Sequence, residues 1–162
     1  MTTQLALDDV ARIMELSAST KDAQATYAAV DALTQRVIGH KLFTVMRHLP
    51  ETSEVERVYS SNISAYPLAG RKPKQGTPWG AAVLDRGEVF IAADAEGVRA
   101  AFSDHALISQ LGISSILNVP LRHRGRVLGT MNVSHDAGHF TPDTVEKGKV
   151  LAALLAPLLL SA

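Results

Sequence analysis

Two short apolar runs joined by a tight turn constrain the fold of this chain more than any other feature. Ile113–Leu121 and Arg126–Ser134 both have the length of a strand, and the segment Arg122–Gly125 separates them. Gly125 can adopt the positive φ angle that a tight turn between twisted strands requires. The pattern therefore predicts a β-hairpin, and with it an antiparallel sheet.

A second hairpin and several helices are predicted around the first one. Lys41–Leu49 and Glu54–Ser60 are short, β-branched runs, and turn-forming residues lie between them. The first forty residues show helical spacing, and the Thr-Pro-Asp run at 141–143 is typical of a helix start. Shorter helices are predicted within 77–87 and 98–111. This order of helices and strands indicates one α+β domain.

The composition excludes several classes of function. The 162 residues match the size of one domain, which is about 150 residues. Lys plus Arg and Asp plus Glu both number 16, and the resulting zero net charge argues against nucleic-acid or membrane-surface binding. The absence of cysteine excludes disulfides, cysteine-ligated metals and cysteine nucleophiles.

Neither a membrane span nor a secretory signal is visible. The longest apolar run, Leu151–Leu160, has ten residues, whereas a membrane span needs roughly 20. The N-terminus MTTQLALDDV lacks a basic region followed by an apolar one. We therefore expect a cytoplasmic protein.

Glycines, asparagines and apolar residues recur in a distinctive pattern within residues 112–140. The pattern consists of Gly112, Ser115, Leu117, Asn118, Val119, Pro120, Leu121, Gly125, Leu128, Gly129, Thr130, Asn132 and Phe140. It resembles the C-terminal half of a GAF domain, and the predicted elements from about residue 22 onward fit the same family. The resemblance implies a mostly antiparallel central sheet, with the N- and C-terminal helices on one face and short helices and loops over the other. We accordingly divide the chain into a helical extension, residues 1–19, and a GAF-like ligand-binding domain, residues 20–162.

The resemblance also implies a pocket for a small ligand, without identifying the ligand. Relatives bind cyclic nucleotides, bilins, haem or small metabolites, mostly in regulation. The GAF-type free methionine sulfoxide reductases use cysteine, so this chain does not belong to that branch, and bilin attachment is not expected for the same reason. No kinase, DNA-binding or cyclase segment accompanies the domain. We therefore expect a stand-alone sensory or regulatory domain without a cofactor.

Residues 62–78 form the predicted cover of this pocket. The segment combines aromatic residues with several cations, which is typical of an anion-binding lid, although a solvated loop would have a similar composition. We expect a small, polar and possibly anionic metabolite to bind between this segment and the sheet. The predicted ligand-binding residues are Tyr66, Arg71, Lys72, Trp79, Asp104, His105, Asn118 and Asn132.

A small enzyme on the same scaffold is the competing hypothesis. His105 follows Asp104 and is the candidate acid/base, because an imidazole is the side chain best suited to proton transfer near neutral pH, with Arg71 or Lys72 stabilising negative charge. Asp104 could instead cap the helix that follows it.

A metal site is not predicted. His135 and His139 flank Asp136, but this segment indicates a loop rather than a helix. Their four-residue spacing therefore does not direct both imidazoles at one ion.

The terminal helices predict a homodimer. The last ten residues of the C-terminal helical stretch, which ends at Leu160, have no polar face. Leu154, Leu155, Leu158 and Leu159 are therefore expected to form an apolar patch of a kind that monomers rarely expose. An alanine ridge in the second helix permits close packing between helices. The alternative is that Val10–Leu16 of the N-terminal extension covers the patch within one chain.

Overall fold

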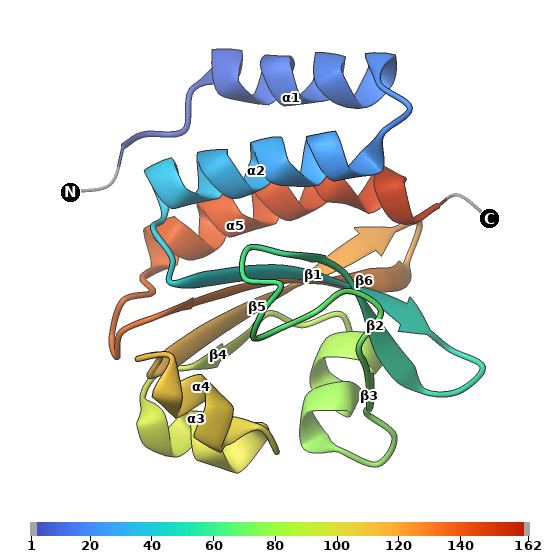
Figure 1. Ribbon diagram of the computed structural model, residues 1–162. Coiled ribbons are helices and arrows are strands. Elements are labelled where there is room, and N and C mark those ends of the chain that lie inside the picture. The colour runs from blue at the N-terminus through green and yellow to red at the C-terminus, as the bar shows by residue number, and fades with distance from the viewer. Residues whose placement is uncertain (1–2, 161–162) are drawn as a thin grey trace.

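A computed structural model describes residues 3–160 of the chain (Figure 1). The elements follow the predicted order, with one additional short strand inside the 62–78 segment. They are α1 (Leu7–Ser19), α2 (Ala23–Val37), β1 (Leu42–Leu49), β2 (Glu54–Ser60), β3 (Arg71–Pro73), the π-helical turn η1 (Gly80–Asp85), β4 (Phe90–Ala92), α3 (Ala95–Ala101), α4 (His105–Gln110), β5 (Ser115–His123), β6 (Arg126–His135), α5 (Pro142–Leu155) and the 3₁₀ turn η2 (Ala156–Leu159).

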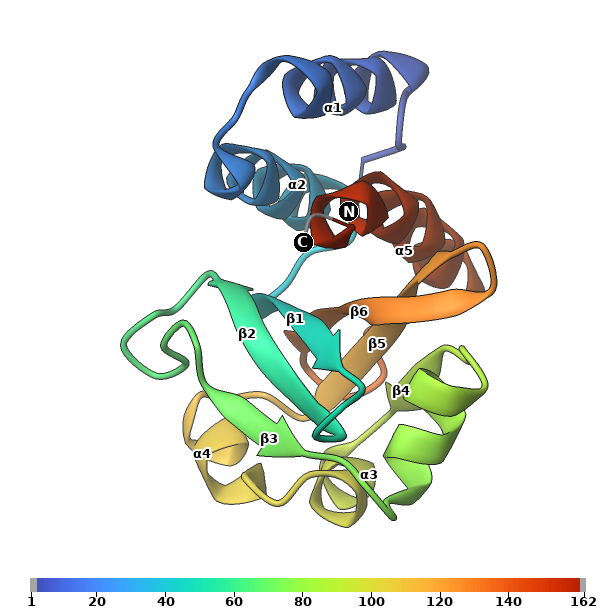
Figure 2. The ribbon, with the colours of Figure 1, turned by 90° about the vertical axis from the view of Figure 1, so that its right-hand side faces the viewer.

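The strands form one six-stranded sheet in the order β3-β2-β1-β6-β5-β4, and every neighbouring pair is antiparallel. Both predicted hairpins are present, β1 with β2 and β5 with β6. The sheet curls strongly when viewed along its strands (Figure 2). The predicted α+β class with an antiparallel central sheet is confirmed.

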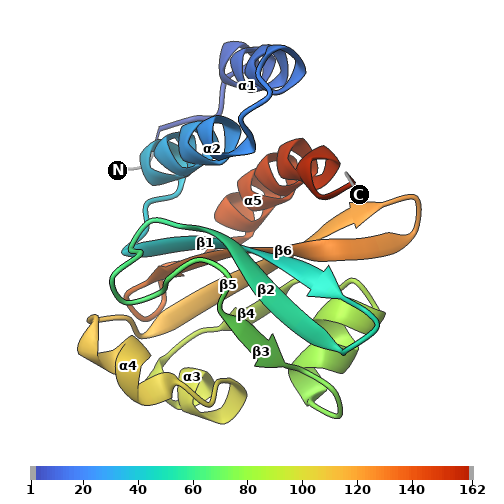
Figure 3. The same cartoon turned by 45° about the vertical axis from the view of Figure 1, so that its right-hand side comes forward.

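Helices cover the two faces of the sheet unequally. The long helices α2 and α5 lie on one face, with α1 stacked outside α2, while η1, α3 and α4 lie on the other (Figures 1 and 3). In consequence there are two apolar cores. The larger one lies under α2 and α5, and the smaller one lies between the sheet and the short helices.

Side-chain alternation along the strands decides which residues enter which core. On β6, Met131 and Val133 point toward the long helices and are fully buried there. The residue between them, Asn132, points toward the short helices instead. On β1, Phe43 and Val45 likewise point toward the long helices, and Thr44 between them points toward the short helices.

The C-terminal leucines do not form the expected exposed patch. Leu155 and Leu159 are buried in the larger core, while Leu154 and Leu158 are partly buried against it. The reason is the tighter 3₁₀ turn η2, which contains Pro157 and directs Leu159 onto the sheet. Helix α1 covers α2, and its Ile13 joins the same core. No helix within residues 3–160 is both long and apolar enough to cross a membrane.

Candidate functional site

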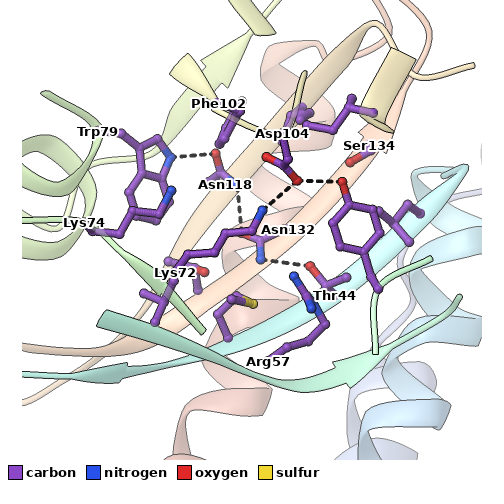
Figure 4. A pocket seen from close by; sticks show the side chains of 17 residues that line it. Thr44, Arg57, Lys72, Lys74, Trp79, Phe102, Asp104, Asn118, Asn132 and Ser134 are labelled. Carbon is purple, nitrogen blue, oxygen red and sulfur yellow. Dashed lines mark hydrogen bonds and ion pairs between the residues drawn. The ribbon is translucent and has the colours of Figure 1, made fainter. Parts of the chain in front are cut away.

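A cavity of about 70 Å³ lies between the sheet and the short helices (Figure 4). Five strands contribute to its wall, and the remaining residues come from the 61–79 segment and from the region of α4. The lining residues are Leu42, Thr44, Met46, Val55, Arg57, Tyr66, Lys72, Lys74, Trp79, Phe102, Asp104, Ile108, Ile116, Asn118, Thr130, Asn132 and Ser134. The lining thus combines apolar side chains with hydroxyl, amide and charged groups.

The floor of the cavity is a row of polar side chains across three strands. Thr44 of β1 lies opposite Asn132 of β6, and Asn132 lies opposite Asn118 of β5. Because directly paired residues project from the same face of a sheet, register alone brings these three side chains together.

Hydrogen bonds connect this row into a chain that begins at Trp79. The indole Nε1–H of Trp79 donates to Asn118 Oδ1 over 2.9 Å. The Asn118 amide donates to Asn132 Oδ1 over 2.7 Å, and the Asn132 amide donates to Thr44 Oγ1 over 3.0 Å. The chain fixes the orientation of both amide groups and holds the indole ring against the sheet.

A second polar group, around Asp104, forms the opposite wall. Its carboxylate accepts hydrogen bonds from Tyr66 Oη and Lys72 Nζ, each 2.7 Å long. Burial alone would raise the pKa of Asp104, but Lys72 and Tyr66 together hold this pKa below its usual value. Burial and the bond to Asp104 both raise the pKa of Tyr66, so its hydroxyl stays protonated at neutral pH. The Asp104 side chain makes no bond that caps α4.

Lys74 lies between two aromatic rings. Its Nζ stands 4.6 Å from the centre of the Trp79 ring and 5.7 Å from that of Phe102. Burial, reinforced by the nearby charge of Lys72 and opposed by that of Asp104, lowers the pKa of Lys74 to about 8. Lys74 forms no ion pair with any residue in the range 3–160.

Two buried polar atoms at the cavity wall lack a hydrogen-bond partner among the described residues. One is Nε of Arg57, whose side chain is buried, stacks 4.8 Å from the Tyr66 ring centre and donates through Nη1 to the Pro67 carbonyl. The other is the hydroxyl of Thr130, a residue with 0% exposure. Buried polar groups are nearly always satisfied, so each of these two atoms, which have almost no accessible surface, carries a desolvation penalty.

Six of the eight predicted ligand-binding residues line this cavity, namely Tyr66, Lys72, Trp79, Asp104, Asn118 and Asn132. Arg71 does not, because alternation along β3 turns it outward when Lys72 points inward, and it pairs with Glu54 and Glu56. His105 does not either. It is exposed and borders a different hollow beside Arg99, since α4 begins at this residue and turns it away from Asp104.

The enzyme hypothesis combined His105 with Arg71 or Lys72. Of these three side chains only Lys72 lines the cavity, whereas Arg71 pairs with Glu54 and Glu56 and His105 borders a different hollow. The rings of His135 and His139 stack 3.6 Å apart, and His139 Nε2 lies 2.8 Å from the Ile38 carbonyl oxygen. Among residues 3–160, no group of three or more His, Cys, Asp or Glu side chains is arranged to hold a metal ion.

The sequence-based selection missed several lining residues. Arg57, Lys74, Thr44 and Ser134 also line the cavity, as does Thr130, which the sequence indicated as a polar pocket contact beside the two asparagines. The available signal was the strand period of two: Ser134 follows Asn132 at that spacing, and Lys74 follows Lys72 at the same spacing.

The fold and the cavity define a class of protein, the α+β domains whose antiparallel sheet carries a polar cavity under a cover of short helices. Within that class, the family model of the GAF domain matches residues 10–159, and the chain belongs to this family.

Solved GAF domains share this fold at low sequence identity. One, from a phosphoenolpyruvate-protein phosphotransferase of Coxiella burnetii, has a TM-score of 0.74 at 17% identity, covering 93% of this chain and 90% of that one. The phycocyanobilin-bound GAF domain of a cyanobacterial phytochrome has a TM-score of 0.73 at 15% identity, covering 97% of this chain and 95% of that one. A search of curated proteins found no match.

Proposed function

We propose that this GAF domain is a sensor or regulatory module that binds a small anionic metabolite in the cavity between the sheet and the 62–78 segment. The observation that carries this proposal is the charge of the cavity wall, where Arg57, Lys72 and Lys74 face a single carboxylate, Asp104. Since Lys72 is already paired with Asp104, Arg57 and Lys74 remain available to an anion.

The size of the cavity limits the ligand to a few non-hydrogen atoms. Its volume is about 70 Å³, and on the same measure one water molecule needs about 10–15 Å³. A small carboxylate fits these dimensions, whereas a tetrapyrrole such as the phycocyanobilin of the cyanobacterial relative is far larger.

Acetate binding should depend on pH in a defined direction. Lys74 is charged below its pKa of about 8 and neutral above it, while Asp104 and Tyr66 do not titrate near this value. Acetate should therefore bind most tightly below pH 8, and its affinity should fall by about tenfold above that pH, the contribution of one hydrogen bond to a charged group. Fluorescence of Trp79, the only tryptophan, measures this titration, with acetamide as the uncharged control. Equal binding of acetamide, or affinity that rises with pH, would contradict the proposal.

Thr130→Val should raise stability and weaken acetate binding together. The valine side chain has the same shape without the orphaned hydroxyl, so the free energy of unfolding should rise by about 1 kcal/mol. Thr26→Val is the matched control, because Thr26 also carries an unpartnered buried hydroxyl but lies on α2, across the sheet from the cavity. Denaturant unfolding should show a gain in both variants, and only Thr130→Val should change acetate affinity.

We also propose a homodimer through the helical layer, with α1 in the interface. Leu7 and Met14 lie two turns apart on one face of α1 and are 83% and 58% exposed, respectively. This stripe lies on the outermost helix, on the side away from the cavity (Figure 1). A second copy of the chain packed on this stripe would bury it.

The double substitution Leu7→Asp/Met14→Asp should convert a dimer into a monomer, because it places charge in the proposed contact. Light scattering at micromolar concentration should give twice the 17.3 kDa chain mass for the unaltered protein and one chain mass for the variant. Ile63→Asp is the control, since Ile63 is 64% exposed but follows β2, outside the helices. A monomeric unaltered protein would refute the dimer.

A further inference from the structure

Two lysines of the cavity occupy different environments although only one residue separates them. Lys72 is paired with the Asp104 carboxylate at 2.7 Å. Lys74 has no such partner among the described residues, and its amine stands over the Trp79 and Phe102 rings. Figure 4 shows both side chains in the same cavity, with Lys74 folded back against the indole ring. The two amines are therefore suited to different tasks, one to neutralising charge and the other to nucleophilic attack.

We propose that Lys74 forms a reversible imine with the carbonyl carbon of a small 2-oxo acid bound in this cavity. The inference rests on the proposed function, because the carboxylate of the 2-oxo acid would occupy the position proposed above for the bound anion. Arg57, which lines the cavity and has no carboxylate partner among the described residues, would hold the carboxylate, while Lys72 stays paired with Asp104. The carbonyl carbon next to it would then lie toward Lys74, which lines the same cavity.

The protonation state of Lys74 supports this role. With a pKa of about 8, about one tenth of the Lys74 amines are unprotonated at pH 7. A lysine with the ordinary value of 10.5 has only about one free amine in three thousand at that pH. The charged groups around Lys74 are Lys72 on β3, Arg57 on β2 and Asp104 before α4, while His48 and Asp85 border it on the side of η1.

The reaction needs no oxidant or reductant. The lone pair of the neutral Nζ attacks the carbonyl carbon, a C–N bond forms, the π electrons of the carbonyl move to oxygen, and one N–H proton passes to that oxygen. The resulting carbinolamine loses this oxygen as water together with the second N–H proton, and a C=N bond forms between the lysine and the 2-oxo acid. Amine plus carbonyl thus gives imine plus water, and hydrolysis reverses the step. Lys72, which is hydrogen-bonded to Asp104, is the proton donor on the cavity wall that can assist these transfers.

Reductive trapping on the full chain tests the proposal. Incubation with pyruvate and cyanoborohydride should convert the imine into a stable carboxyethyl-lysine, which intact-mass measurement and peptide mapping can locate. We expect one carboxyethyl group per chain, on Lys74. The yield should rise as the pH approaches 8, and an excess of lactate should suppress it, because lactate offers the same carboxylate without a carbonyl. Lys74→Arg should lose the adduct, whereas Lys149→Arg, which changes an exposed lysine on α5, should keep it.

Mapping of the unaltered chain keeps the test decisive even if Lys74→Arg fails to fold. Adducts spread over surface lysines, or none at Lys74, would overturn the imine proposal. If lactate nevertheless binds and shifts Trp79 fluorescence, the anion site stands and only the imine is refuted. If neither lactate nor pyruvate binds, the proposed function itself fails.

Discussion

Replacing Gly129 with alanine is expected to lower the free energy of unfolding by about 3 kcal/mol. A Cβ at this position would fall well inside contact distance of the Met46 carbonyl oxygen, and it would lie 2.7 Å from Leu159 Cδ1. Met46 belongs to the strand paired with β6, so backbone rather than a flexible side-chain tip has to move. Urea unfolding followed by circular dichroism measures the loss.

Gly97→Ala is the matched control for this substitution. Gly97 lies in the short helix α3, and the nearest atoms to an added Cβ there are 3.5 Å away, an ordinary contact distance. Alanine should therefore be neutral or stabilise the protein by up to about 1 kcal/mol through its helix propensity. Equal stability of the two variants would contradict the close approach of β1 and η2 to Gly129.

Replacing Asn118 with leucine is expected to cost about 2 kcal/mol of unfolding free energy and to abolish acetate binding. Leucine has a similar volume, but it leaves the Trp79 indole N–H and the Asn132 Oδ1 without their partners. Each buried group that loses its partner carries a desolvation penalty. Trp79 also loses the bond that holds its ring against the floor of the cavity, so its emission spectrum should shift.

A double-mutant cycle with Trp79→Phe isolates the hydrogen bond from the change in packing. Trp79→Phe removes the indole N–H, so the second substitution no longer leaves that donor unsatisfied. The double variant should therefore be more stable than the sum of the two single losses predicts, by about 1 kcal/mol. Strict additivity would show that the Trp79–Asn118 bond makes no contribution.

The sequence predicted the fold well because the relevant signals are local. The hairpin 113–134, the 41–60 hairpin and the Thr141 helix start all depend on residues close together in the chain, and all three form. The antiparallel pairing followed from the short turns. The strand β3 was missed because its three residues lie in a segment rich in glycine and proline, and it forms only by pairing with β2.

The candidate site was predicted less completely, for a related reason. Asn118 and Asn132 stood out as amides on otherwise apolar strands, and both line the cavity. The environment of Arg57 was not visible from the sequence, because its burial depends on Tyr66 and Pro67 folding back over it. The different environments of Lys72 and Lys74 likewise depend on Asp104, which pairs with Lys72 from 32 residues away in the chain.

By itself, the sequence determined the elements, their antiparallel pairing and the period-two pattern that places amides and hydroxyls on one face of the sheet. Only the tertiary structure decided that Arg71 and His105 point away from the cavity and that Leu155 and Leu159 belong to the core. The physical reason is that backbone propensity and alternation act over a few residues. The burial and charge of a side chain, by contrast, depend on which distant segments cover it.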